Sequence, residues 1–71
     1  MTQSPGFSQT ARVFAFLEAH PTRWFPAAQI AFAVDLAVST TRTHLRHLVA
    51  QRLVDRVRLR SVIDYRLADS G

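Results

Sequence analysis

The chain has no cysteine among its 71 residues. Disulfide bonds, thiolate nucleophiles, thiolate metal sites and redox sensing by a thiol are therefore excluded. No uncharged stretch exceeds eleven residues, and the one over residues 24–34 contains Pro26 and Gln29. A membrane-spanning helix needs about 20 apolar residues, so we expect no membrane crossing. Because no lysine or arginine precedes Arg12, the start also lacks the basic region of a signal peptide, and we expect a cytoplasmic protein.

The sequence is also short, and it lacks the residue patterns of a catalyst. A domain of this size buries only about 60% of the surface that its unfolded chain exposes, which disfavours a barrel or a two-layer enzyme. Paired carboxylates, a glycine-rich phosphate loop and a Ser/His/Asp arrangement are all missing. His44 and His47 are three residues apart on a predicted helix, but a metal site would need further ligands, and only His20 and scattered carboxylates could supply them. We predict a binding module that is not an enzyme and needs no cofactor or metal.

Positive charge is concentrated in the last half of the chain. All nine cations are arginine, and charges over residues 1–38 cancel. Residues 39–60 hold six arginines against Asp55 alone, a net charge of +5, and the remaining residues add −1. An unbalanced cationic segment attracts nucleic acid or an anionic membrane surface. The alternative is a solvated face that binds nothing.

Hydrophobic periodicity predicts three helices followed by a β-hairpin. Residues 1–7 contain Pro5 and Gly6 and show no periodicity, which is typical of a flexible arm. Ser8 is a suitable cap for the first helix, and Ser39 or Thr40 for the third. After Leu53 the period changes from helical to two. The predicted segments are helices over residues 8–20, 26–35 and about 39–52, a short extended bridge over 23–25, and a hairpin that turns near residues 60 and 61.

This order of elements resembles the winged helix-turn-helix domain of bacterial transcription regulators, above all IclR-like, ArsR-like and MarR-like repressors. The segment Ile30–Val54, IAFAVDLAVSTTRTHLRHLVAQRLV, carries the resemblance, together with the wing-like ending Tyr65-Arg66-Leu67. Asp35 and Arg52 depart from the pattern, because glycine is commonest at both positions. The matching positions are Ile30, Ala31, Leu36, Leu45 and Leu48. The resemblance implies a mainly α, three-helix winged helix-turn-helix with a small antiparallel β-hairpin, forming a DNA-binding domain over residues 8–71.

The outer face of the third predicted helix offers donors suited to a DNA major groove. Short hydroxyl residues at its amino end would let the backbone approach a phosphate, and longer donors one or two turns later would reach base edges. The resemblance places base and phosphate contacts on the same positions. We expect Arg46 to contact guanine and Arg42 to hold phosphate, unless this face is merely polar and solvated. The candidate residues are Ser39, Thr40, Arg42, Thr43, Arg46 and His47.

The predicted wing carries Arg56, Arg58 and Arg60 at every second residue. In a strand all three would project from one face and repel one another, and a DNA backbone beside them would relieve that repulsion. We therefore predict phosphate contacts. The alternative is protection of an edge strand against unwanted sheet pairing.

The aromatic residues are expected to serve mainly as core. Phe14 and Trp24 should fill the space between the first helix and the sheet, and Tyr65 should close the base of the wing. Phe16 lies about 160° from Phe14 on a helical wheel and is predicted to be exposed as a dimer contact. Burial beneath the arm or Phe7 is the alternative.

Together these features predict a sequence-specific regulator that binds double-stranded DNA, with residues 39–52 in the major groove and the wing on the backbone. One such domain covers a short half-site, so a homodimer or a cooperative oligomer is expected. The alternative is a winged-helix adaptor that docks on an acidic protein. A recogniser of left-handed duplexes or RNA is disfavoured, because the third helix lacks an aromatic residue for stacking.

Overall fold

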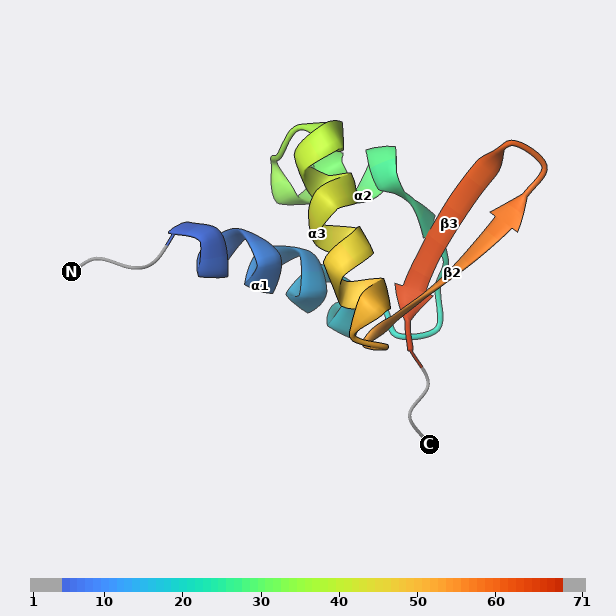
Figure 1. The fold of residues 1–71 in the computed structure, drawn as a ribbon, viewed down its shortest axis with the longest axis horizontal. Helices are drawn as coiled ribbons and strands as arrows, with labels where there is room; N and C mark the ends of the chain where they lie inside the picture. Colours follow the sequence, from blue (N-terminus) through green and yellow to red (C-terminus); the bar gives the residue numbers. More distant parts are fainter. Residues whose placement is uncertain (1–4, 69–71) are drawn as a thin grey trace.

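A computed structural model of the chain describes residues 5–68, with three helices and one small antiparallel sheet. This arrangement is the predicted winged helix-turn-helix fold (Figure 1). The sheet has the strand order β1-β3-β2, so the short β1 adds a strand to the predicted hairpin. The elements are α1 (Pro5–Ala19), β1 (Phe25–Pro26), α2 (Ala27–Val34), α3 (Val38–Ala50), β2 (Val54–Leu59) and β3 (Val62–Leu67).

Two helix starts differ from the prediction. Helix α1 begins at Pro5, since proline has a helical φ and its missing N–H is not needed in a first turn. Part of the predicted arm is therefore helical, and residues 1–4 lie outside the described residues. Helix α3 begins at Val38 with Ala37 as its N-cap, and neither Ser39 nor Thr40 caps it. The Ala37 carbonyl already accepts the Thr41 N–H at 2.9 Å, which places both hydroxyl residues inside the first turn.

In the part of the chain that the structure describes, three turns contain a residue with positive φ, and none of the three is glycine. Asp35 ends α2 in left-handed geometry, with φ 61° and ψ 49°. Arg52 has φ 64° between α3 and β2, and Arg60 has φ 61° at the tip of the wing. The two positions where the resemblance calls for glycine, Asp35 and Arg52, thus have the backbone geometry that glycine adopts at least cost.

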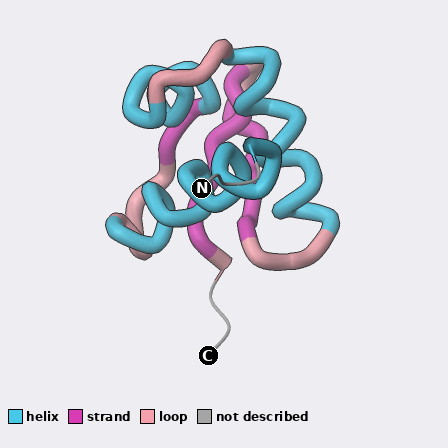
Figure 2. The backbone as a smooth tube through the Cα atoms, turned by 90° about the vertical axis from the view of Figure 1, so that its left-hand side faces the viewer, coloured by secondary structure: helices cyan, strands magenta, loops and turns pink. Residues whose placement is uncertain are grey.

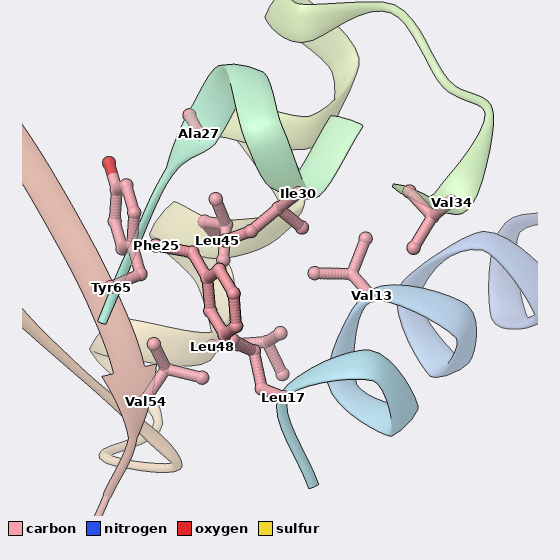
Figure 3. Packing of buried hydrophobic residues seen from close by; sticks show 10 residues of the cluster. All are labelled: Val13, Leu17, Phe25, Ala27, Ile30, Val34, Leu45, Leu48, Val54 and Tyr65. Atoms are coloured by element: carbon pink, nitrogen blue, oxygen red, sulfur yellow. The ribbon is translucent and has the colours of Figure 1, made fainter. Parts of the chain in front are cut away.

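The core lies where the three helices meet the base of the sheet (Figure 3). Leu17, Ile30 and Leu45 are fully buried, one from each helix. Phe14 packs against this cluster and is partly buried. Tyr65 is buried at the base of the wing, as predicted.

Two aromatic predictions are wrong. Trp24 is 37% exposed and lies beneath the Arg66 guanidinium, whose carbon is 4.4 Å from the ring centroid. Its neighbour Phe25 enters the core instead, since successive residues in a strand point to opposite faces. Phe16 is half-buried, with its ring 5.0 Å from that of His20 and 4.9 Å from that of Phe25. The exposure on which a Phe16 dimer contact was predicted is therefore not found.

The wing projects from the helical body with two distinct faces (Figure 1). Helices cover one side of the strands, as the view turned by 90° shows (Figure 2). Arg56 lies opposite Tyr65 and Arg58 opposite Ile63, while Asp55 lies opposite Arg66. Paired residues share a face, so Arg56 and Arg58 lie on the face of Tyr65, and Asp55 and Arg66 lie on the other.

Candidate nucleic-acid interface

A hollow of about 530 Å³ lies between α3, the start of α2 and the inner face of the wing. Three of the predicted site residues line it, namely Arg42 and Arg46 from α3 and Arg56 from β2. The fold thus brings together arginines that are up to 14 positions apart in the sequence. The other lining residues are Pro26, Ala27, Ala28, Val49, Ser61, Val62, Ile63 and Tyr65.

The geometry of α3 places its two arginines on the side of the wing. Arg42, Arg46 and Val49 follow the spacing of one helical stripe, which forms a wall of the hollow. Thr41 and Leu45 lie on the buried side of the same helix. Because the core holds that side, the guanidinium groups are directed outward.

The remaining candidates on α3 lie outside the hollow. Ser39, Thr43 and His47 are exposed, and Thr40 is half-buried. The Thr43 hydroxyl donates to the Ser39 carbonyl at 3.2 Å, so one of its hydrogen-bonding positions is already used. These residues form an outer polar surface next to the arginine-lined wall.

The wing arginines do not form the predicted row of three. Arg56 and Arg58 share the inner face of the sheet, but Arg60 lies in the two-residue turn that the pair Leu59 and Val62 closes. Its positive φ takes it out of the alternation of the strand. Strand β2 is also an edge of the sheet, so protection of that edge stays the alternative prediction for its charges.

The arginines that line the hollow have little negative charge to compensate them. Among residues 5–68 the structure has a single ion pair, between Arg66 Nη2 and Asp55 Oδ2 at 3.9 Å, and it lies on the opposite face of the wing. Arg42, Arg46 and Arg56 are exposed and have no acidic partner in that range. The hollow therefore combines uncompensated positive charge with apolar lining residues that include Val49 and Ile63.

Polar contacts that the sequence did not reveal join α1 to α3 and to α2. The His44 ring bridges two residues of α1, with Nδ1 2.9 Å from Thr10 Oγ1 and Nε2 3.3 Å from Gln9 Oε1. Arg12 of α1 donates a hydrogen bond to the Val34 carbonyl at the end of α2. These residues are 22 to 35 positions apart in the sequence, so local patterns carry no signal of the contacts.

Over residues 5–68 no three histidine or acidic side chains gather in a way that could hold a metal ion. Within the same range no helix has the length and apolar character needed to span a bilayer.

The comparison with known families decides the class of this domain. The family described as the IclR helix-turn-helix domain matches residues 8–58. The chain belongs to this family. It is thus a DNA-binding domain of the transcriptional-regulator type, and the expectation of a non-enzymatic module is confirmed.

Solved structures show the same fold as this IclR-type domain. A possible transcriptional regulator from Methanosarcina mazei Go1 has a TM-score of 0.79 and 19% identity, over 87% of this chain and 56% of that protein. The Zalpha domain of Carassius auratus PKZ, solved in complex with Z-DNA, has a TM-score of 0.75 and 22% identity, over 90% and 98% of the two chains. NolR from Sinorhizobium fredii has a TM-score of 0.67 and 23% identity, over 99% and 83%. The chain thus spans little more than half the length of the Methanosarcina protein. No curated protein matches it.

Proposed function

We propose that this IclR-type domain is a sequence-specific regulator that binds double-stranded DNA through α3 and the wing. The observation that supports this most is the position of Arg42, Arg46 and Arg56 around one hollow, where they are exposed and have no acidic partner among residues 5–68. A duplex supplies a matching array of phosphates on both sides of a groove into which a helix fits.

Helix α3 is proposed to lie in the major groove. Arg46 is the guanine contact, because a guanidinium can donate to guanine O6 and N7 together. Arg42, one turn earlier, holds a phosphate. Ser39 and Thr40 lie in the first turn, where backbone N–H groups and the helix dipole favour a phosphate. Thr43 and His47 complete the polar surface that faces the duplex.

The wing is proposed to follow the sugar-phosphate backbone. Arg56 and Arg58 act from the inner face of β2, and Arg60 acts from the tip. A domain that neutralises about four phosphates should show a slope of roughly −3 to −5 in a plot of log affinity against log salt concentration.

A homodimer or a cooperative oligomer is part of the proposal. One domain covers a short half-site, and useful affinity and specificity require a longer site. The packing of Phe16 against His20 and Phe25 gives no support to Phe16 as the contact. A cytoplasmic location likewise stays a prediction.

The test is selection of bound sequences from random duplexes, followed by gel shifts of the selected site at two salt and two protein concentrations. We expect a defined motif, weaker binding at higher salt and more than one copy per full site. Arg46→Ala should reduce discrimination among sequences and leave general affinity for DNA. An unchanged sequence preference would refute the role of Arg46.

A left-handed duplex and an acidic protein are the competitors to include, because one structural relative was solved with Z-DNA and the hollow is cationic. The exposed positions of α3 carry no Phe, Tyr or Trp, so we expect weaker binding to the left-handed form. Failure to bind any duplex, combined with capture by an acidic polypeptide, would favour the adaptor function.

A further inference from the structure

The start of α2 forms one end of the hollow, opposite the stripe of α3. Pro26, Ala27 and Ala28 line the hollow there together with Tyr65 of β3. Ala28 is exposed and its side chain is only a methyl group, so a ligand can come close to the backbone at this point.

The backbone at this end has hydrogen-bond donors to offer. The first N–H groups of any α-helix have no acceptor within the helix. In α2 the N-cap residue is Pro26, which makes no side-chain capping hydrogen bond. The first turn therefore presents backbone donors and the positive end of the helix dipole to the hollow.

Tyr65 supplies an independent indication of a ligand. The residue is only 8% exposed, and the hydrogen bonds of residues 5–68 include none to its hydroxyl. The hydroxyl is not among the fully buried unpartnered atoms, so the polar tip of an otherwise buried side chain reaches the hollow. Tyrosines with an apolar ring packed in the protein and a wet hydroxyl are enriched at interfaces. The ring stands beside the segment that enters α2, with its oxygen turned toward the end where Ala27 lies (Figure 3).

Arg56 adds positive charge at the same place. It is the direct cross-strand partner of Tyr65, so the two side chains lie next to each other on the inner face of the wing. Both line the hollow, and Arg56 is exposed and has no acidic partner in the described part of the chain.

We propose that the first turn of α2, the Tyr65 hydroxyl and Arg56 form a binding site for one phosphate diester of the DNA backbone. This inference rests on the proposed function and adds Tyr65 to the residues that contact DNA. The backbone N–H groups and the hydroxyl donate to the phosphate oxygens, and the guanidinium compensates the charge. Tyr65 thereby has two roles, a ring that packs in the core and a hydroxyl that binds DNA.

Tyr65→Phe is the first test, because it removes one oxygen and keeps the ring in the core. We expect affinity for the selected duplex to fall at least about tenfold, as for the loss of one hydrogen bond to a charged acceptor. The salt slope should not change, since no charge is lost, whereas Arg56→Gln should make it shallower by about 0.9. The thermal midpoint of the free protein should stay close to that of the wild type.

Neutral methylphosphonate substitution, one phosphate at a time, locates the contact. One position should weaken wild-type binding strongly and Tyr65→Phe binding clearly less. Arg46→Ala is the matched control. It should bind DNA with less sequence discrimination, but methylphosphonate at the identified phosphate should weaken its binding as strongly as that of the wild type. Wild-type affinity of Tyr65→Phe, with an unaltered methylphosphonate profile, would overturn the site and leave the proposed DNA binding intact.

Titration of the free domain with inorganic phosphate, followed by amide chemical shifts, separates the two proposals. Shifts at Ala28 and Gln29 that Tyr65→Phe weakens are expected. If the wild type binds no duplex, the proposed function fails. Amide shifts at Ala28 and Gln29 would in that case mean that the site binds free phosphate, and the proposed DNA contact would be overturned. Absence of duplex binding and of shifts would overturn both.

Discussion

The left-handed geometry of Arg52 predicts that glycine at this position stabilises the domain. A non-glycine residue in this region costs about 1–2 kcal/mol, and Arg52 has φ 64°. Glycine removes that cost but loses about 0.5–1 kcal/mol through the greater freedom of the unfolded chain. Arg52→Gly should therefore raise the free energy of unfolding by about 0.5–1 kcal/mol, which is roughly 2–8 °C in the thermal midpoint of a domain of this size.

Thermal and urea unfolding of three variants would measure this effect. Arg52→Ala removes the same charge and keeps a Cβ atom, so it should be less stable than Arg52→Gly by about 1 kcal/mol. Ala33→Gly, at an exposed position inside α2, should show the opposite sign and cost about 1 kcal/mol. A result in which Arg52→Gly is no more stable than Arg52→Ala would refute the assignment of backbone strain to this turn.

Three further substitutions test the packing and the charge of the domain. Thr41 is fully buried and its hydroxyl has no partner within residues 5–68, so Thr41→Val should raise the free energy of unfolding by about 1 kcal/mol in urea titrations. A decrease would mean that the hydroxyl makes a hydrogen bond in the folded protein. Arg12 donates to the Val34 carbonyl at the negative end of the α2 dipole, so Arg12→Met should lower the thermal stability by about 0.5–1 kcal/mol, and high salt should reduce the difference. Arg56→Gln should make the salt slope of DNA binding shallower by about 0.9 in fluorescence anisotropy, while Arg52→Gln, outside the hollow, should leave it unchanged. Equal slopes for these two variants would mean that the hollow has no special role.

Sequence periodicity was sufficient for the three helices, because each buries one regular stripe, and the change to a period of two located the hairpin. Leu45 and Leu48 on α3 lie in the core at the expected spacing. Strand β2 buries only Val54, which lies on the same face as Arg56 and Arg58. The end of α2 at Asp35 also followed, since aspartate tolerates left-handed geometry better than most residues.

What periodicity missed depends on contacts between distant segments. A helical wheel puts Phe16 opposite Phe14, but it contains no information about Phe25 and His20, which cover the ring of Phe16. Similarly, the face that Trp24 takes depends on the register of β1 against β3. Such errors arise because amphipathicity describes one element at a time.

The sequence was sufficient to name most of the residues of the candidate site, but not to show how the fold brings them together. Arg42, Arg46 and Arg56 stood out by charge, yet their meeting around one hollow requires the fold. Tyr65 was assigned to the core by its hydrophobic spacing, and only the register with Arg56 shows that its hydroxyl borders the same hollow.

Mapping of the duplex on the domain in solution is the most direct test of the proposed interface. Side-chain NMR signals of the arginines and of Trp24 would be followed as the selected duplex is added. We expect large shifts for Arg42, Arg46 and Arg56, and little change at Trp24, which lies on the opposite face of the sheet beside Arg66. Shifts concentrated at Trp24 and Arg66, with the three arginines of the hollow unmoved, would contradict the proposed interface.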